Sequence, residues 1–434
     1  ILADDMGYGD VSYLNENSKI CTYNIDKMAQ DGMAFTDAHA SSAVCTPSRY
    51  SILTGRYNWR SSLKKGVLFV LKEAGYKTAC VGKWHLGMDW QRKSSNLEDI
   101  DYAKPINNSP VDYGFDYFFG ISASLDMPPY VYIENNKATQ IPNRITEGKG
   151  PMSGWRKGPT APDFKHDEVL PRLTEKALDI LDDYSSFPFF LYFPLPAPHT
   201  PILPTADFRG KSNTNEYGDF VLMCDDIVGQ IVKKLEEKGI EQNTIIIYTS
   251  DNGCSPQADY QKLAKLGHNP SYIFRGHKAD IYEGGHRIPL IIKWPEFIKA
   301  GRISNETVCL VDLMATVADI VGIRLPNNAG EDSISNLPIW LNDKHKTPLR
   351  EATVHHSIDG SFSIRKDYWK LVMCPGSGGW SYPKPGEESL DMPPIQLYNI
   401  KEDIGETKNV YDIYPDVVDE LKQLLTKYII EGYS

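Results

Sequence analysis

Strand-like and helix-like segments alternate through the first two-thirds of this 434-residue sequence. Apolar periodicity and helix-end signals predict helices at residues 25–30, 68–74, 168–184 and 217–238. Gly239 then provides a helix-ending signal before a buried strand at residues 244–249. Alternation of this kind is typical of a helix-covered sheet rather than an all-β sandwich. We therefore predict an α/β fold, a large α/β/α sandwich with a mostly parallel central sheet.

The pattern changes near residue 326, where loops rich in Pro, Gly and Asn begin. Short strands are expected at residues 362–364 and 369–373, followed by a closing helix at residues 415–430. These segments predict a smaller C-terminal α+β subdomain with a short antiparallel sheet. We place the boundary near residue 330, which gives a first domain at residues 1–330 and a C-terminal subdomain at residues 331–434.

Charge and composition exclude several classes of protein. The chain has 46 Lys and Arg against 57 Asp and Glu, a formal charge of −11, so no nucleic-acid partner is expected. Prolines interrupt the longest apolar stretch, residues 187–204, so no transmembrane segment is expected. Seven cysteines are too few for a disulfide scaffold, and their odd number leaves at least one thiol unpaired or chemically employed. The sequence begins at Ile1, so a signal peptide is expected to have been removed or left out.

Polar residues follow four of the predicted strands. They are Asp4 and Asp5, Lys83 and His85, His199, and Asp251 and Asn252. Ligands of open α/β sheets bind at the carboxyl ends of the strands, so we expect these groups to converge. Asp4, Asp5, Asp251 and Asn252 offer only hard oxygen ligands, which suit Ca²⁺ or Mg²⁺. Taken alone, either pair is more often an ordinary turn after a strand.

Residues 45–55, CTPSRYSILTG, carry the strongest local signal. Thr46 is expected to cap a short helix, Pro47 suits its first position, and Gly55 can end it. Cys45 would then lie at a helix N-terminus, where free N–H groups and the helix dipole favour a bound anion. A lone cysteine is otherwise most often a small buried apolar residue.

This segment resembles the signature of the type I sulfatases, Cys-x-Pro-Ser-Arg followed by Leu-Thr-Gly. The resemblance implies the alkaline-phosphatase-like fold and the conversion of the signature cysteine, matched by Cys45, to formylglycine. Further segments resemble sulfatase motifs in the family's order: residues 4–10, 82–87, 198–201 and 250–253, and Lys278 with residues 282–285. The interval from Cys45 to Lys83 is shorter than the resemblance implies, so we expect a segment to be missing around residues 66–68.

The resemblance implies Ca²⁺ at the four oxygen ligands and a hydrated Cys45 aldehyde that attacks sulfur in line. Basic side chains would supply positive charge for the anionic ester: Arg49, Lys83 and Lys278. Arg49 would stabilise the deprotonated diol. His199 and Lys278 would help the alcohol to leave, and His85 would take the proton from the second hydroxyl to expel sulfate.

A sulfated sugar is implied rather than a steroid, because no apolar membrane-inserting hairpin is evident. Loops near residues 355–357 and 376–380 resemble those of polysaccharide-degrading sulfatases, which favours sulfated galactose or N-acetylgalactosamine. The C-terminal subdomain is therefore expected to contribute to the substrate pocket. Candidate substrate-binding residues are Ser124, His268, His355, His356 and Arg365, with Trp155 and Trp380 as aromatic surfaces.

The resemblance also implies a partner and a location. A formylglycine-generating maturation enzyme is expected as a partner, and the expected localisation is periplasmic or secreted. Two alternatives stay open: a phosphonate monoester or phosphodiester hydrolase on the same fold, and a non-catalytic glycan-binding relative.

Overall fold

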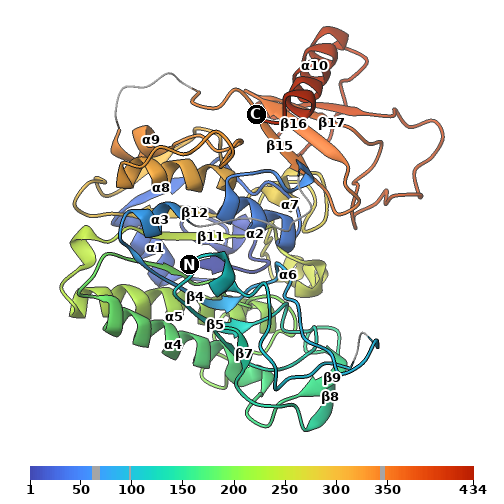
Figure 1. Cartoon of the computed structure of the whole chain (residues 1–434). Helices are drawn as coiled ribbons and strands as arrows, with labels where there is room; N and C mark the ends of the chain where they lie inside the picture. Colours follow the sequence, from blue (N-terminus) through green and yellow to red (C-terminus); the bar gives the residue numbers. More distant parts are fainter. Residues whose placement is uncertain (61–68, 97–98, 343–347) are drawn as a thin grey trace.

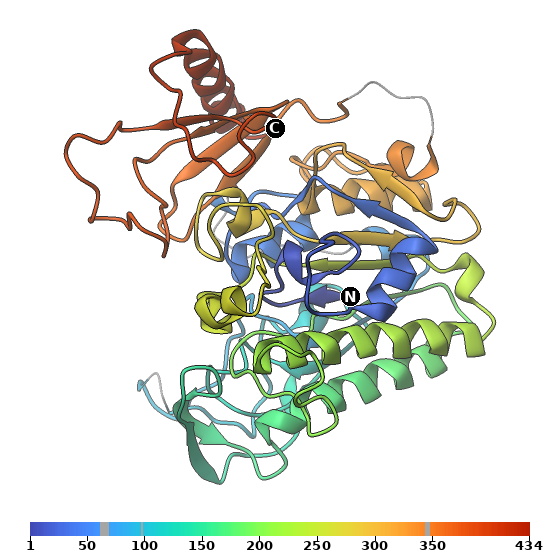
Figure 2. The same ribbon diagram turned by 180° about the vertical axis from the view of Figure 1, so that it is seen from behind.

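A mixed β-sheet between two layers of helices forms the larger part of the molecule (Figures 1 and 2). The computed structural model describes residues 1–60, 69–96, 99–342 and 348–434. The segment expected to be missing around residues 66–68 lies outside these described residues. The α/β class predicted from the alternating segments is confirmed.

Five parallel strands form the centre of the sheet. Their order is β5 (Tyr117–Ile121), β4 (Lys77–Lys83), β10 (Phe189–Tyr192), β1 (Leu2–Ala3) and β11 (Ile246–Ser250). β1 joins the two halves, because Leu2 N donates to Phe193 O at 3.0 Å and Leu195 N donates to Leu2 O at 2.8 Å. The parallel centre therefore brings the carboxyl ends of five strands to one edge.

Shorter strands extend the sheet on both sides of this parallel centre. β6 (Ile133–Glu134) and β7 (Lys137–Ala138) follow β5, and both pairings are antiparallel. Beyond β11 come β12 (Leu290–Lys293) and β2 (Met33–Phe35), both antiparallel to their inner neighbours, and then β13 (Arg302–Ser304), which is parallel to β2.

Helices cover both faces of the sheet (Figure 1). One face carries α1 (Tyr23–Gln30), α4 (Val169–Tyr184) and α5 (Glu216–Glu237). The other carries α2 (Cys45–Thr54), α3 (Phe69–Glu73), α8 (Leu313–Val321) and α9 (Leu337–Leu341). Two short helices, α6 (Tyr260–Lys265) and α7 (Glu283–His286), lie in the connections after β11. The predicted helices at residues 25–30, 168–184 and 217–238 correspond to α1, α4 and α5, whose apolar faces recur at regular helical spacing.

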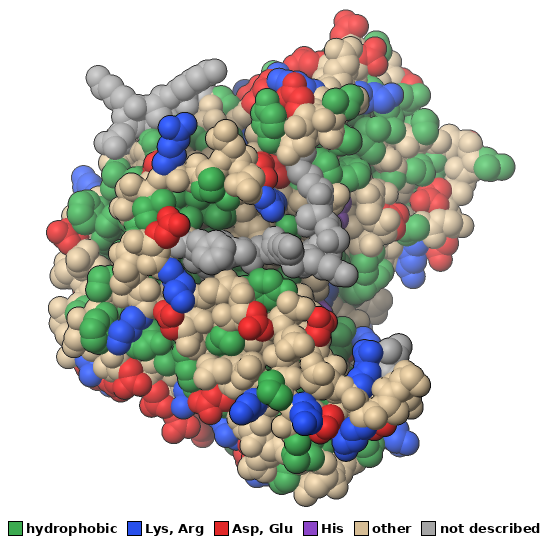
Figure 3. Space-filling view, in the orientation of Figure 1, with side chains coloured by type: hydrophobic (Ala, Val, Ile, Leu, Met, Phe, Trp, Pro, Cys, Tyr) green, Lys and Arg blue, Asp and Glu red, His purple; other side chains and the backbone are tan. Residues whose placement is uncertain are grey.

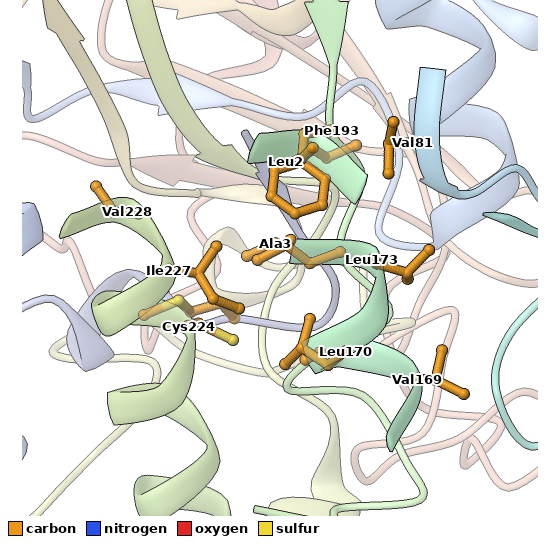
Figure 4. Packing of buried hydrophobic residues seen from close by; sticks show 14 of the residues in the cluster. Leu2, Ala3, Val81, Val169, Leu170, Leu173, Phe193, Cys224, Ile227 and Val228 are labelled. Carbon is orange, nitrogen blue, oxygen red and sulfur yellow. The ribbon is translucent and has the colours of Figure 1, made fainter. Parts of the chain in front are cut away.

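Apolar side chains of α4 and α5 fix the position of the short strand β1. Figure 4 shows Leu170 and Leu173 of α4 and Ile227 of α5 gathered around Ala3. All four side chains are buried, and full burial of a Leu or Ile side chain contributes about 1.5–3 kcal/mol. Because β1 is held from one face and from both neighbouring strands, the two residues that follow it leave the sheet in a defined direction.

An antiparallel sheet forms the C-terminal subdomain, at the upper right of Figure 1. Its strands are β15 (Thr353–His356), β16 (Phe362–Lys366), β17 (Trp369–Val372) and β18 (Gln396–Asn399). The closing helix α10 (Pro415–Glu431) contacts β16 and β17. The predicted antiparallel subdomain is confirmed, while the boundary near residue 330 stays a prediction. α9 belongs by packing to the larger unit, because Trp340 lies in an apolar cluster with Leu290 and Ile292.

Two further strand pairs complete the described structure. β3 (Ala38–His39) pairs with β14 (Val308–Cys309), and β8 (Arg144–Gly148) forms a hairpin with β9 (Trp155–Thr160).

Candidate active site

The polar residues that follow the central strands meet at the carboxyl edge of the sheet. Asp4 and Asp5 follow β1, Lys83 ends β4, and Asp251 and Asn252 follow β11; all five are buried. Cys45 Sγ lies 3.4 Å from Asp4 Oδ1 and 3.9 Å from Asp5 Oδ1. Groups far apart in the sequence thus form one cluster. Figure 3 shows the surface hollowed between the C-terminal subdomain and the β8–β9 hairpin.

A separate apolar cavity of about 720 Å³ lies between β10 and β11. Its lining includes Leu191, Ile247 and Trp294, and among the described residues it contains none of the polar groups that follow the strands. An apolar cavity without convergent polar groups cannot polarise a reacting bond. We therefore place the candidate site at the polar cluster.

Helix α2 carries Cys45 as its first residue. Its C-terminus is closed by Gly55 in a left-handed conformation, φ 64°, whose N–H donates to Ser51 O at 2.9 Å. The expectation that Thr46 caps the helix is wrong, because the helix already begins at Cys45 and Val44 is the residue before it. The Thr46 hydroxyl instead donates to His85 O at 3.1 Å, which ties α2 to the segment after β4.

Three cationic side chains pair with the three carboxylates of the cluster. Arg49 Nε donates to Asp251 Oδ2 at 2.8 Å, Lys83 Nζ donates to Asp4 Oδ2 at 2.6 Å, and Lys278 Nζ lies 2.7 Å from an Asp5 carboxylate oxygen. All six side chains are almost fully buried. The described cluster is therefore charge-balanced, and a bound divalent cation would make it positive.

The pKa values of Asp251 and Asp4 shift in opposite directions although both carboxylates are buried. Burial raises the pKa of Asp251 to about 6, with Arg49 opposing the shift. Burial also disfavours the charged form of Asp4, but Lys83, His199 and Arg49 outweigh it and hold the pKa of Asp4 well below its usual range. Asp4 is thus ionised over the whole neutral range, because cations surround it on several sides.

Burial also sets the protonation of the groups around Cys45. It raises the pKa of the Cys45 thiol, so the unmodified thiol is protonated at neutral pH and is a poor nucleophile. Burial, together with the nearby Lys83, lowers the pKa of His85 to about 2, so its ring is neutral. Burial disfavours the Lys278 ammonium, but Asp5 outweighs it and raises the pKa of Lys278.

The donor set suits a hard divalent cation. Ligand atoms of Asp4, Asp5, Cys45 and His199 lie within 4.8 Å of one another. Asn252 Nδ2 donates to Asp5 Oδ1 at 2.8 Å, which fixes the amide orientation, and the buried Asn252 Oδ1 has no hydrogen-bond partner among the described residues. A buried acceptor without a donor is costly unless a ligand satisfies it. The available oxygens fit Ca²⁺ or Mg²⁺.

Three further buried polar atoms of the site have no hydrogen-bond partner in the described part of the chain. They are Arg49 Nη2, His85 Nδ1 and Ser124 Oγ. Ser124 lies in the loop after β5, beside the segment that carries His85, since His85 N donates to Ser122 O at 3.0 Å. Unsatisfied groups at one edge are expected where a polar ligand completes the hydrogen bonding.

His199 lies beside the Asp5–Lys278 pair. Its Nδ1–H donates to Thr200 O at 2.6 Å, and its Nε2 lies 3.6 Å from Asp5 Oδ2. Burial, with Lys278 acting in the same direction, lowers the pKa of His199. In the free protein, Nε2 is therefore the unprotonated ring nitrogen.

Three residues expected to bind substrate are paired inside the protein. His268 is buried with Nε2 2.9 Å from Asp10 Oδ1. Arg365 is buried and donates to both carboxylate oxygens of Asp37, at 2.7 and 2.8 Å. His355 is fully buried with Nδ1 2.9 Å from Ala40 O. Each side chain is buried and has its polar atoms paired inside the protein, and its expected contact with a substrate stays a prediction.

The remaining candidates stay predictions. His356 is mostly buried, pairs with Asn58, and borders the residues before α2, because Ala43 N donates to its carbonyl at 3.0 Å. Trp155 stacks on His166, with ring centroids 3.8 Å apart. Trp380 is 37% exposed, and its main-chain N–H donates to Asp280 Oδ1. Asp280 lies two residues after Lys278 in the sequence.

Buried histidines also gather where the larger unit meets the C-terminal subdomain. His286 and His355 stack with centroids 4.0 Å apart, and His39 Nδ1 lies 3.1 Å from His286 Nδ1. Lys370 Nζ of the subdomain pairs there with Glu283 at 3.1 Å. Burial lowers the pKa of all three histidines.

We expect the unfolding temperature to fall as the pH drops below about 6.5, the ordinary histidine pKa. The folded-state pKa values lie below the unfolded value, so the unfolded chain binds more protons in this range and acid favours unfolding. Each neutral histidine lowers the free energy of unfolding by up to about 1.4 kcal/mol for each pH unit of acidification. Scanning calorimetry from about pH 7.5 to about pH 5.5, at fixed calcium concentration, measures the effect. A midpoint that stays constant or rises on acidification contradicts it.

Comparison with known proteins identifies the family. The family model described as Sulfatase matches residues 1–323, and that described as N-sulphoglucosamine sulphohydrolase, C-terminal, matches residues 276–431. The chain is 32% identical to an N-acetylgalactosamine-6-O-sulfatase of Bacteroides thetaiotaomicron, over 98% of this chain and 91% of the relative. It is also 32% identical to the N-acetylgalactosamine-6-sulfatase of Mus musculus, over 79% of this chain and 65% of that protein.

A solved structure gives the same result. It comes from work on the metabolism of multiple glycosaminoglycans by Bacteroides thetaiotaomicron, and it matches with a TM-score of 0.85 at 31% identity, covering 98% of this chain and 97% of that one. The chain belongs to the sulfatase family and is a sulfuric ester hydrolase with the alkaline-phosphatase-like fold. Within that family it is similar to the enzymes named for N-acetylgalactosamine 6-sulfate. Every helix in the described part of the chain is too short or too polar to cross a bilayer.

Proposed function

We propose that this chain hydrolyses sulfate esters of carbohydrates, with formylglycine formed from Cys45 and Ca²⁺ held by Asp4, Asp5, Asp251 and Asn252. The position of Cys45 carries the proposal, since its Sγ lies 3.4 Å from Asp4 at the edge where the carboxylates meet. The protonated thiol is a poor nucleophile, which supports conversion to another group. The names of the relatives support 6-sulfated N-acetylgalactosamine as substrate, and sulfated galactose is the other sugar expected from the sequence.

Charge supports an anionic ester as the ligand. Three buried carboxylates and three buried cations balance, so a divalent cation would give the site a net positive charge. Ca²⁺ in this position would orient the sulfate and polarise its oxygens, and the hydrated aldehyde would supply the attacking hydroxyl. Arg49 Nη2, which lies 3.7 Å from Asp4 Oδ1, and Ser124 Oγ accept or donate no hydrogen bond within the described part of the chain, and both would donate to oxygens of the bound ester.

The chain's own residues orient this site and move its protons. Arg49 also donates through Nη1 to Lys83 O at 3.0 Å, so the guanidinium and the lysine that holds Asp4 are fixed together. His85 Nδ1 has no hydrogen-bond partner among the described residues and would take the proton of the second hydroxyl, once a bound anion opposes the lowered pKa of the ring. His199 Nε2 and Lys278 Nζ lie on the Asp5 side and would hydrogen-bond the ester's bridging oxygen. A bound anion beside His199 favours its protonated form, opposing the lowered pKa of the free protein.

The loss of kcat on replacing His199 by glutamine is expected to depend strongly on the leaving group of the substrate. We expect kcat for a sugar sulfate to fall by about 10²–10⁴-fold, because an alkoxide needs a proton to leave. For 4-nitrophenyl sulfate, whose leaving group is stable as the anion, we expect kcat to fall by less than about tenfold. Both substrates are assayed on the same His199→Gln preparation, so partial misfolding lowers the two rates equally. Equal losses on both substrates contradict the role in leaving-group protonation.

The function is tested by a screen of sulfated galactose and N-acetylgalactosamine mono- and disaccharides that differ only in sulfate position. Released sulfate is the readout, and the 6-sulfates are expected to react fastest. Matched phosphate and phosphonate esters are assayed in parallel. Dominant turnover of these esters would reject the sulfatase proposal in favour of the alternative hydrolase class, and binding of sugars without turnover would favour a non-catalytic relative.

We also propose that the natural setting is the periplasm or the outside of the cell, where sulfated polysaccharides are met. A formylglycine-generating enzyme would supply the oxidised Cys45. The intact mass of the Cys45 peptide from purified protein distinguishes formylglycine from cysteine. Cysteine in a fully active preparation would overturn this part of the proposal.

A further inference from the structure

Asp10 is a buried carboxylate that none of the proposed catalytic steps uses. It closes the segment of residues 4–10 whose first two members are the proposed metal ligands, and its side chain is fully buried. Its Oδ2 accepts the N–H of Gly7 at 2.7 Å and the hydroxyl of Tyr217 at 2.5 Å, and its Oδ1 lies 2.9 Å from His268 Nε2. The expected set of site residues included His268 but neither Asp10 nor Tyr217.

The hydrogen bonds define how His268 meets Asp10. Lys19 N lies 3.3 Å from His268 Nδ1 and donates to it, so Nδ1 is an acceptor. The ring proton assigned on this pattern is therefore on Nε2, and it is donated to Asp10. Asp10 thus receives donors from three different parts of the chain: its own loop, the start of α5, and the segment after α6.

Tyr217 connects this group to Asp5. Its hydroxyl, 2.5 Å from Asp10, is also 3.3 Å from the main-chain carbonyl oxygen of Asp5, so one proton is shared by two acceptors. Asp5 has a left-handed backbone, φ 65°, which is unfavourable for a residue other than glycine. Such a conformation persists only where the surrounding structure holds it.

The loop that follows Asp5 is confined on its other side. A Cβ at Gly7 would lie 2.2 Å from Pro270 O, and one at Gly9 would lie 2.2 Å from Asn269 O. Gly9 N donates to Pro270 O at 2.7 Å. The loop therefore runs directly against the segment that His268 begins.

We propose that Asp10, Tyr217 and His268 form a positioning unit that sets the affinity of the metal site by holding Asp5 in its left-handed conformation. This inference rests on the proposed function, because it assumes that Asp5 is a calcium ligand. Without the unit, Asp5 can relax to an ordinary backbone conformation, and its carboxylate turns away from Asp4, Asp251 and Asn252. Residues that orient metal ligands typically change metal affinity by about 10–100-fold when they are lost.

The test is the calcium affinity of Tyr217→Phe, measured by isothermal titration calorimetry on the full chain. This substitution removes one hydroxyl and keeps the buried ring. We expect the dissociation constant for Ca²⁺ to rise by about tenfold or more. We also expect kcat to recover towards the wild-type value at saturating Ca²⁺, because Tyr217 would act through Asp5 and not on the substrate.

Tyr57→Phe is the matched control. Tyr57 is equally buried, and its hydroxyl also contacts a main-chain group, since it accepts from Val354 N at 3.1 Å in the C-terminal subdomain. The control should lose stability without losing calcium affinity. His268→Gln keeps an N–H donor, so its calcium affinity should stay closer to that of the wild type than the affinity of His268→Leu. If Tyr217→Phe does not fold, the comparison of these two variants tests the positioning unit.

The outcomes separate this inference from the proposed function. If the wild-type protein binds no Ca²⁺, the proposed metal is wrong, and the inference falls with it. If the wild type binds Ca²⁺ and Tyr217→Phe binds it equally well, the positioning unit alone is overturned. A rise in the dissociation constant in Tyr217→Phe but not in Tyr57→Phe supports the inference.

Discussion

Cys45→Ser is expected to abolish turnover while the fold is retained. Serine has one hydroxyl, whereas the proposed oxidised and hydrated residue has two, and the second is needed to release sulfate. Loss of a nucleophile typically costs about 10⁴-fold or more in kcat. The fold should survive, because serine differs from cysteine by one atom and Cys45 begins α2 rather than packing within the apolar core.

Sulfate release and thermal unfolding are both measured on Cys45→Ser. Cys80→Ala is the matched control, since Cys80 is a fully buried cysteine of β4 that packs in the apolar core. The control should lose stability and keep turnover, which is the reverse of the result expected at Cys45. Full activity in Cys45→Ser would refute the proposed nucleophile.

Removal of calcium is expected to lower activity by at least about 100-fold, and added Ca²⁺ should restore it. The ion pairs of the cluster explain the size of the effect. The Lys83 and Lys278 ammonium groups lie 2.6 and 2.7 Å from Asp4 and Asp5, so the carboxylates neutralise their charges. The site then has no excess positive charge with which to bind an anionic ester.

Activity and unfolding temperature are measured after exhaustive chelation and after return of Ca²⁺ or Mg²⁺. A ligand that binds only the folded state stabilises it by about 2.7 kcal/mol at 100 times its dissociation constant, so the two readouts should move together. Stronger recovery with Ca²⁺ than with Mg²⁺ is expected. Unchanged activity in the chelated protein would remove the metal from the mechanism.

The positions of the proposed site residues were predictable because a parallel sheet fixes where its strands end. Asp4, Lys83 and Asp251 each follow a recognisable apolar run, and the carboxyl ends of such strands share one edge. The helical faces of α4 and α5 were predictable for a similar reason, since their apolar periodicity repeats over several turns. Local pattern was sufficient in each case.

Pairing between distant side chains was not predictable. Arg365 was expected at a sugar, yet it pairs with Asp37, 328 positions away, and no local pattern distinguishes these two uses of an arginine. Asp10 and Tyr217 are separated by 207 positions, so their contact has no signal in either segment. The cap expected at Thr46 failed because its hydroxyl meets His85 O, a tertiary contact that outweighs local capping preference.

The contact between the two units has a consequence for how the chain can be divided. Asp37 and Glu283 on the larger unit pair with Arg365 and Lys370 on the subdomain, and all four side chains are buried. Breaking a buried ion pair by removing one partner costs about 3–5 kcal/mol, and both pairs would be lost together. We therefore expect the C-terminal part to unfold together with the larger unit, and a chain shortened near the boundary to lose both ion pairs.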